Sequence, residues 1–323
     1  MATLAYILAA SHSGSTLLAM LLGSHPEVCT VGELKATSLG DPDRYHCSCG
    51  ARIRDCAFWR DLAGRMAARG YEFDVTRATT HITAGASRYE AALLRPLHRG
   101  RWWEVARDAA LALSPSWRGR LERFAGVNHA LVESLGAQTG ARVVVDSSKV
   151  GIRLKYLLRI PQLDVRVVRL VRDGRAVSLT YTDPVNYADA RDPHRRAGGE
   201  GGTRDEERLT VAEAAREWRR SNEEADAILA GVDPARQITI TYEALCTDTN
   251  ATLASVWRFL GVSAREVGAR WRERPHHVIG NGMRFDTDSA VKLDDRWRTA
   301  LGPGALEAFN AEAGALNRRF GYA

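Results

Sequence analysis

The first 22 residues place an apolar run, a serine-rich loop and a leucine-rich run directly one after another. Leu4 to Ala9 is short, apolar and free of glycine and proline, so it predicts a buried β-strand. The polar loop Ser11 to Thr16 follows, and Leu17 to Leu22 is too rich in leucine for a turn and predicts a helix. A strand, a loop and a helix in this order direct backbone N–H groups and the positive end of the helix dipole at one point, where an anion can bind.

The loop resembles a phosphate-binding loop that lacks the lysine of nucleotide hydrolases. Gly14 leaves room for a phosphate to approach the backbone, and the hydroxyls of Ser13, Ser15 and Thr16 can donate hydrogen bonds. The pattern G-x-x-x-x-G-K-[ST] is absent, because no lysine stands before Ser15 or Thr16. The loop therefore disfavours an ordinary ATPase or GTPase, while a serine-rich turn that caps a core helix stays open at this point.

Length and composition indicate one large domain. The chain has 323 residues, 45% of them hydrophobic and 26% charged, which suffices for a substantial core. We expect a single α/β domain over residues 1–323. No window approaches the ~20 apolar residues of a membrane helix, and the N-terminal apolar stretch has neither the basic leader nor the length of a secretion signal. We therefore expect a cytoplasmic protein with no integral membrane segment.

The net charge of +6 suits an anionic partner. Arginine is spread along the whole chain, and no basic-aromatic stripe or nucleic-acid motif is present. A small anion is therefore expected as the ligand, and nucleic acid is not. The sequence gives no indication of the oligomeric state.

Three further runs are apolar or β-branched and alternate with helical sequence, namely 142–145, 165–171 and 237–241. This alternation predicts a central parallel sheet with helices on both faces, a three-layer α/β fold of the P-loop-like type. Ligands of such sheets bind at the carboxyl ends of the strands. We expect the polar loops Ser11 to Thr16, Asp146 to Lys149 and Arg172 to Arg175 to converge there.

Two segments interrupt the alternation. Between residues 71 and 138 the chain is rich in alanine, leucine and arginine, which predicts a helical insertion. Ordinary burial preferences place its aromatic side chains in the core or along a groove; these are Trp102, Trp103, Trp117 and Phe124. Residues 183–208 are charged and rich in glycine, which predicts a mobile loop over the acceptor site.

A second anion site follows the run 165–171. Arg172 stands at its end, and Thr180 lies eight residues later, two helical turns along. This pair resembles the arginine-x7-hydroxyl pattern with which sulfotransferases hold the 3′-phosphate of 3′-phosphoadenosine 5′-phosphosulfate (PAPS). The loop Ser11 to Thr16 resembles the 5′-phosphosulfate loop of the same family, with His12 in place of the family's lysine or arginine. Thr180 replaces the family's usual serine and keeps the hydroxyl.

The motifs are closest in style to those of bacterial, carbohydrate and tyrosylprotein sulfotransferases. Gly23 to Val28 resembles the segment after their loop, and Ile240 to Leu245 with Phe259 to Gly261 resembles a later strand and helix. The resemblance implies PAPS as the sulfuryl donor. The residues that it implies for donor binding are Ser11, His12, Ser13, Gly14, Ser15, Thr16, Arg172, Thr180, Tyr242, Asn281, Arg284 and Arg296.

Sulfuryl transfer needs a base for the acceptor proton and cationic or N–H donors for the leaving phosphate, in an in-line geometry. Glu33 follows a short β-like segment and, allowing a one-residue insertion, resembles the glutamate base of tyrosylprotein sulfotransferases. Lys149 resembles the stabilising lysine of related enzymes and would supply the charge that the loop lacks. His12 is a second candidate, either as base or as a donor to the sulfuryl oxygens.

This chemistry requires no metal, and we expect none among the site residues. Cys47, Cys49 and Cys56 nevertheless lie together in one glycine-punctuated stretch with His46. Buried free thiols are the first interpretation and a Cys47–Cys56 disulfide the second, although a reducing compartment disfavours it. Zinc is the third, because the spacing is not a C-x2-C pair and a fourth ligand is not evident.

Two alternative functions remain. A kinase-like phosphotransferase using ATP would need a loop lysine and a magnesium-binding aspartate, and Asp146 is positioned for the latter role. A non-catalytic nucleotide-binding module would bind the nucleotide without turnover. The motifs favour transfer of a sulfuryl group from PAPS to a hydroxyl of a small-molecule, sugar, lipid or peptide acceptor.

Overall fold

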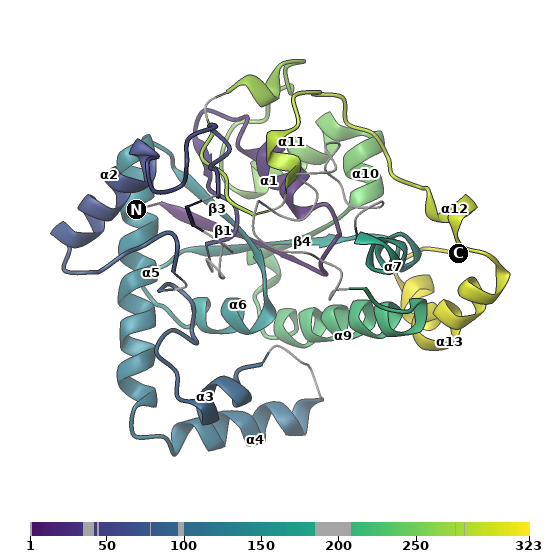
Figure 1. The fold of residues 1–323 in the computed structure, drawn as a ribbon, viewed down its shortest axis with the longest axis horizontal. Coiled ribbons are helices and arrows are strands. Elements are labelled where there is room, and N and C mark those ends of the chain that lie inside the picture. Colours follow the sequence, from purple (N-terminus) through teal and green to yellow (C-terminus); the bar gives the residue numbers. More distant parts are fainter. Residues whose placement is uncertain are drawn as a thin grey trace.

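Figure 1 shows a computed structural model of the chain. It describes residues 2–34, 42–43, 45–77, 79–95, 100–184, 208–274, 276–280 and 282–323. Residues 185–207, which make up most of the expected loop 183–208, lie outside this part of the chain, as does Asn281.

A five-stranded parallel sheet forms the centre of the fold, in the order β2-β3-β1-β4-β5. Its strands are β1 (Thr3–Ala9), β2 (Val28–Thr30), β3 (Val143–Lys149), β4 (Val165–Val171) and β5 (Gln237–Thr241). A strand that is flanked by two others and covered on both faces is apolar along its whole length, which explains the sequence of β1. The expected parallel α/β sheet is confirmed.

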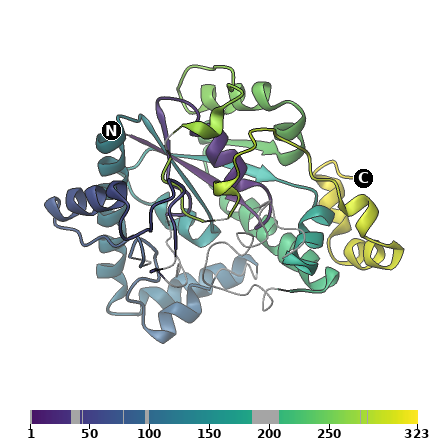
Figure 2. The ribbon, with the colours of Figure 1, turned by 45° about the horizontal axis from the view of Figure 1, so that its top comes forward.

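Helices cover both faces of the sheet (Figure 1). Successive side chains of β1 point to opposite faces, so Tyr6 and Leu8 belong to the core beside α5, α6 and α9, whereas Ala5 and Ile7 belong to the core beside α1, α10 and α11. Helix α13 lies against α7 and α9, so the C-terminal end of the chain closes one side of the domain (Figures 1 and 2). The helices are α1 (Ser15–Leu22), α2 (Ala57–Ala68), α3 (Arg88–Leu93), α4 (Arg101–Ala112), α5 (Trp117–Thr139), α6 (Gly151–Leu157), α7 (Gly174–Thr182), α9 (Val211–Leu229), α10 (Tyr242–Thr247), α11 (Thr249–Phe259), α12 (Trp297–Ala300) and α13 (Pro303–Arg319).

Helices α3, α4 and α5 fall in the segment for which a helical insertion is expected. Trp117 and Phe124 of α5 are buried, as predicted. The prediction for Trp102 is wrong, because its side chain is 85% exposed. Trp102 and the buried Leu111 both lie on α4, and their spacing of nine residues places them on opposite faces of that helix. Leucine therefore supplies the buried face, and the tryptophan points to solvent.

The expected loop from Asp146 to Lys149 is also a wrong prediction, because β3 continues through Lys149. The pairing of β3 with β1 shifts register between Tyr6 and Leu8, which marks a local irregularity in the ladder. The carboxylate of Asp146 accepts hydrogen bonds from the backbone N–H and the hydroxyl of Ser148, both through Oδ1. These local bonds satisfy polar groups that would otherwise disfavour a strand.

Within the described residues, no helix combines the length and the apolar character that crossing a membrane requires.

Candidate active site

The loop between β1 and α1 has the geometry of an anion-binding turn. His12 and Gly14 both have left-handed backbone conformations, with φ angles of 61° and 85°, and Gly14 is the N-cap of α1. No acidic side chain lies in the first turn of α1, so its unpaired backbone N–H groups present a net positive end. Ser13 and Ser15 are buried, and the hydroxyl of Ser13 has no hydrogen-bond partner among the described residues. These donors are available to an anion.

Tyr242, the first residue of α10, packs directly on this loop. A Cβ atom on Gly14 would lie 2.5 Å from Cδ2 of Tyr242. The absent side chain of Gly14 therefore makes room for this ring, in addition to allowing the positive φ angle. The Tyr242 hydroxyl donates to the carbonyl of Lys292 at 3.4 Å. Tyr242 thus fastens the loop to the segment before α12.

Arg172, at the end of β4, connects three parts of the chain. Its guanidinium is fully buried and lies 4.2 Å from the centre of the Tyr242 ring. Nη1 donates to the carbonyl of His12 at 2.8 Å, and Nη2 donates to the carboxylate of Asp294 at 2.9 Å. Arg172 therefore lies directly beside the anion-binding loop, as the sequence predicts, with a carboxylate as its partner.

The carboxylate of Asp294 also accepts a hydrogen bond from the side chain of Arg296, with 2.7 Å between Nε and Oδ1. Burial on its own raises the pKa of Asp294, but the hydrogen bond from Arg296 and the charge of Arg172 together lower it to about 2. The carboxylate is consequently ionised at neutral pH. Arg296 belongs to the same cluster as Arg172 through this shared partner.

Thr180 is buried on α7, and its hydroxyl donates to the carbonyl of Ala176 at 3.2 Å. It is the kind of back-bond to the preceding helical turn that serine and threonine commonly make. Two residues earlier, the buried hydroxyl of Ser178 has no partner among the described residues. Ser178 lies six residues after Arg172, and the sequence motifs do not single it out.

Glu33 and Lys149 form the second cluster. Lys149 ends β3 with a φ angle of 68°, and its Nζ lies 2.5 Å from Oε1 of Glu33. Both side chains are about one-fifth exposed, at 17% and 20%. Gly32 precedes Glu33 with a φ angle of 84°, and its backbone pairs with Ile279 so closely that a Cβ atom would lie 1.9 Å from the carbonyl oxygen of Ile279. Glycine at this position lets the chain turn and present Glu33.

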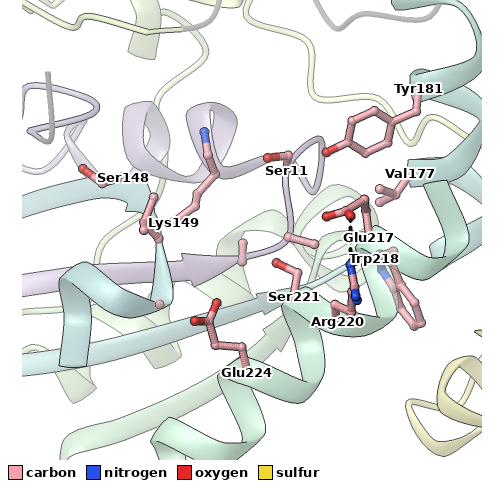
Figure 3. Close-up of a pocket in the computed structure, with 14 residues that line it drawn as sticks. Ser11, Ser148, Lys149, Val177, Tyr181, Glu217, Trp218, Arg220, Ser221 and Glu224 are labelled. Carbon is pink, nitrogen blue, oxygen red and sulfur yellow. Dashed lines mark ion pairs between the residues drawn. The ribbon is translucent and has the colours of Figure 1, made fainter. Parts of the chain in front are cut away.

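A cavity of about 170 Å³ lies beside the loop, between the ends of β1 and β3 and the helices α7 and α9. Ser11 of the loop and Lys149 of β3 both line it. Figure 3 shows Ser221 and Glu224 pointing from α9 toward this space, with Tyr181 on the α7 side. Burial raises the pKa of Glu224 to about 7, with a further contribution from Glu104.

His12 lies at the α7 side of the loop. Its ring meets that of Tyr181 edge to face, with 4.6 Å between the ring centres. The backbone carbonyl of His12 accepts the hydrogen bond from Arg172. The resemblance implies a lysine or arginine at this position. This chain has His12 there instead, and its ring contacts Tyr181 of α7.

Arg284 supports the chain near Glu33. It is buried, its guanidinium lies 4.7 Å from the centre of the Tyr45 ring, and it donates to the backbone carbonyls of His46 and Gly280. The hydroxyl of Tyr45 in turn accepts the N–H of Gly280 at 2.9 Å. These contacts join the segment after β2 to Gly280 and Arg284.

Asp146 is completely buried and serves the core. Its Oδ2 accepts Nε of the equally buried Arg153 at 2.9 Å, while Oδ1 accepts the two bonds from Ser148. Arg153 also donates to Asn128 and to the carbonyl of Thr80. With both carboxylate oxygens engaged and no exposure, Asp146 does not match the magnesium-binding aspartate that an ATP-dependent phosphotransferase needs.

The family assignment rests on the sequence across most of the chain. The sequence model that describes the sulfotransferase family matches residues 5–266. This chain belongs to the sulfotransferase family. This range contains the loop Ser11 to Thr16 and also Glu33, Lys149, Arg172 and Tyr242.

Solved structures of other sulfotransferases share the fold. The sulfotransferase domain from the Synechococcus PCC 7002 olefin synthase is 20% identical with a TM-score of 0.52, and the alignment covers 100% of this chain and 97% of that domain. The sulfotransferase domain from the curacin biosynthetic pathway is 16% identical with a TM-score of 0.51, over 96% of this chain and 97% of that domain. The P-loop-like α/β fold is thereby confirmed. No curated protein matches this sulfotransferase significantly by sequence.

Proposed function

We propose that this sulfotransferase transfers the sulfuryl group of PAPS to a hydroxyl group, with Glu33 as the general base. The observation that carries the proposal is the position of Lys149. Its ammonium group contacts the carboxylate of Glu33 at 2.5 Å, and its side chain lines the same cavity as Ser11 of the anion-binding loop. Lys149 thus connects the proposed base, Glu33, to the cavity beside the anion-binding loop.

The residues present fit the donor. The N–H groups at the start of α1 and the buried hydroxyl of Ser13 offer hydrogen bonds to the 5′-phosphosulfate. Arg172, beside the same loop, offers a guanidinium for the 3′-phosphate, an anion that arginine binds with charge-assisted hydrogen bonds. In the structure the carboxylate of Asp294 accepts a hydrogen bond from that guanidinium, so it would compete with the 3′-phosphate for Arg172.

In the proposed reaction Glu33 accepts the proton of the acceptor hydroxyl while the oxygen of that hydroxyl forms the new bond to sulfur. The bond from sulfur to the phosphate oxygen breaks on the opposite side, and the negative charge that develops there is stabilised by Lys149 and the loop N–H groups. Lys149 serves two roles in succession, because it pairs with the carboxylate of Glu33 before the reaction and faces the leaving phosphate during it. The cavity beside Ser11 has room for the reacting end of an acceptor.

A phosphotransferase that uses ATP is less well supported, because the loop has no lysine and Asp146 is buried in an ion pair with Arg153. Calorimetry with adenosine 3′,5′-bisphosphate (PAP), ATP and ADP distinguishes the two reactions. We expect PAP to bind most tightly. Tighter binding of ATP would contradict the proposal.

Turnover is tested with radiolabelled PAPS and a panel of alcohols, phenols, sugars and hydroxylated peptides. Transfer of the label to at least one hydroxyl acceptor is expected. A protein that binds PAP but transfers label to none of them would instead be the non-catalytic nucleotide-binding module.

A further inference from the structure

Three cysteines and one histidine converge at a point outside the active site. The sulfur atoms of Cys47, Cys49 and Cys56 and a ring nitrogen of His277 all lie within 4.8 Å of one another. The two sulfurs of Cys49 and Cys56 are 3.7 Å apart, and Nδ1 of His277 lies 3.7 Å from the sulfur of Cys47 and 3.4 Å from that of Cys56. His277 is the fourth candidate ligand that the sequence alone does not reveal.

Three of these six separations match the edges of a zinc tetrahedron. Zinc–sulfur bonds of about 2.3 Å and zinc–nitrogen bonds of about 2.0–2.1 Å at tetrahedral angles give ligand separations of about 3.8 Å between sulfurs and about 3.6 Å between sulfur and nitrogen. The three values of 3.4–3.7 Å lie within about 0.2 Å of these, and the other three separations are no longer than 4.8 Å. Four ligands from cysteine and histidine also form one of the usual closed structural sets for this ion.

The local fold explains how the cysteines come together. Cys47 donates its N–H to the carbonyl of Ala51 at 2.9 Å and accepts the N–H of Gly50 at its own carbonyl at 2.9 Å. Gly50 has a φ angle of 89°, a conformation that favours glycine in such a tight turn. A second turn follows, in which the N–H of Asp55 donates to the carbonyl of Arg52, and Cys56 comes next as the N-cap of α2. A short knuckle therefore directs the thiols of residues 47–56 to one side.

His277 is held in place by neighbours that are not ligands. The hydroxyl of Ser48 donates to the carbonyl of His276 at 2.9 Å and accepts the N–H of Val278 at 2.7 Å, so it binds the backbone on both sides of His277. The ring of Phe58 stacks on that of His277 with 4.3 Å between the centres and 7° between the planes. Supporting contacts of this kind orient the ligands of metal sites.

We propose that Cys47, Cys49, Cys56 and His277 bind one Zn²⁺ ion as a closed, structural site. Three thiol protons are released to solvent as the three thiolate bonds form, and His277 binds through Nδ1 as a neutral imidazole. With all four positions taken by side chains, the ion has no open position for a substrate. No electron transfer and no oxidant are involved.

The site ties down the segment that carries Glu33. Two residues after His277, the N–H of Ile279 donates to the carbonyl of Val31 at 3.0 Å, and the N–H of Glu33 donates to the carbonyl of Ile279 at 3.4 Å. The ion would therefore link the knuckle to the strand-like contact that positions Glu33. This consequence, unlike the site itself, rests on the proposed function.

Metal analysis of the full-length protein tests the site without any assay of sulfuryl transfer. The protein is produced in zinc-supplemented medium, purified with a reductant and measured by inductively coupled plasma mass spectrometry. We expect about one zinc ion per chain, and exchange for Co²⁺ should give the intense visible bands of tetrahedral thiolate coordination. Less than about a tenth of an equivalent, with no uptake of added Zn²⁺ or Co²⁺, would overturn the proposal.

Thiol counting separates zinc from the other two interpretations. With zinc bound, three of the five cysteines should resist a thiol reagent until a chelator is added. Five reactive thiols without a chelator, or a count that rises only on adding reductant, would contradict the site. Cys49→Ser should lower the zinc content at least tenfold, whereas Cys29→Ser, a cysteine outside the cluster, should leave it unchanged. Equal zinc in both variants would also contradict it.

Discussion

Arg172 and Asp294, 122 residues apart in the chain, form an ion pair in which the guanidinium is completely buried and Nη2 lies 2.9 Å from Oδ2. The same guanidinium holds the carbonyl of His12 in the anion-binding loop. A carboxylate therefore stands beside the arginine that we propose for the 3′-phosphate. Donor binding must place a second anion next to this one or displace it.

The competition between Asp294 and the phosphate predicts that Asp294→Asn tightens PAP binding. Removing one negative charge beside the phosphate should strengthen binding by about 1 kcal/mol, or roughly fivefold. Calorimetry measures the change, with Asp295→Asn as the matched control, because Asp295 is adjacent but 60% exposed and pairs only loosely with Arg298. Unchanged or weaker binding in Asp294→Asn would show that this carboxylate positions Arg172 without competing.

Arg172→Ala should weaken PAP binding by about 1.5–3 kcal/mol, the cost of losing a charged hydrogen bond to phosphate. Because the substitution also breaks the pair with Asp294, the comparison is made in the Asp294→Asn background, where no charged partner is left behind. Thermal melts confirm that the variants fold. Equal affinity with and without Arg172 in this background would exclude it from the phosphate site.

Glu33→Gln should lower kcat by roughly 10²- to 10⁴-fold, the usual contribution of a general base. PAP affinity should stay within about twofold, because the loop and Arg172 are untouched. Glu27→Gln is the matched control, since Glu27 forms a partly exposed pair with Arg142 at the other end of the sheet. If Glu33→Gln retains full turnover, the proton is removed by another group, and His12 becomes the candidate.

Much of the sheet could be predicted because its signals are local. Four strands appear in the sequence as apolar or β-branched runs, and the polar residues after two of them mark the edge where ligands bind. The extra strand length from Asp146 to Lys149 was not predictable, because polar side chains normally end a strand. Here the carboxylate of Asp146 accepts hydrogen bonds from Ser148 and Arg153, so these polar groups have partners inside the protein.

The partners of the site residues depend on contacts between distant parts of the chain. Asp294 lies beyond any motif that would connect it to Arg172, and His277 is 221 residues from Cys56. The histidine that the sequence places beside the cysteines is His46, and no spacing rule links His277 to them. Trp102 shows the same limit, because residue type alone did not reveal which face of α4 is buried.

Glu224 predicts a pH dependence of stability. Its folded-state pKa is raised from 4.5 to about 7, mainly by burial and also by Glu104, while Arg107 and Lys155 act in the opposite direction. Between these two pH values the folded state binds more protons than the unfolded state, so the free energy of unfolding falls as pH rises through this window and then levels off. Glu224→Gln removes the titration and should be more stable than the wild type by about 1–3 kcal/mol at pH 8, with little difference near pH 4.5.

Urea unfolding at a series of pH values measures this difference. Glu223→Gln is the matched control, because its neighbouring side chain is 40% exposed and pairs with Arg219 on the surface of α9. That variant should follow the pH profile of the wild type. Parallel profiles for Glu224→Gln and the wild type would show that Glu224 titrates at its ordinary value. In that case the carboxyl group would be charged inside the cavity at neutral pH, beside the space where we place the acceptor.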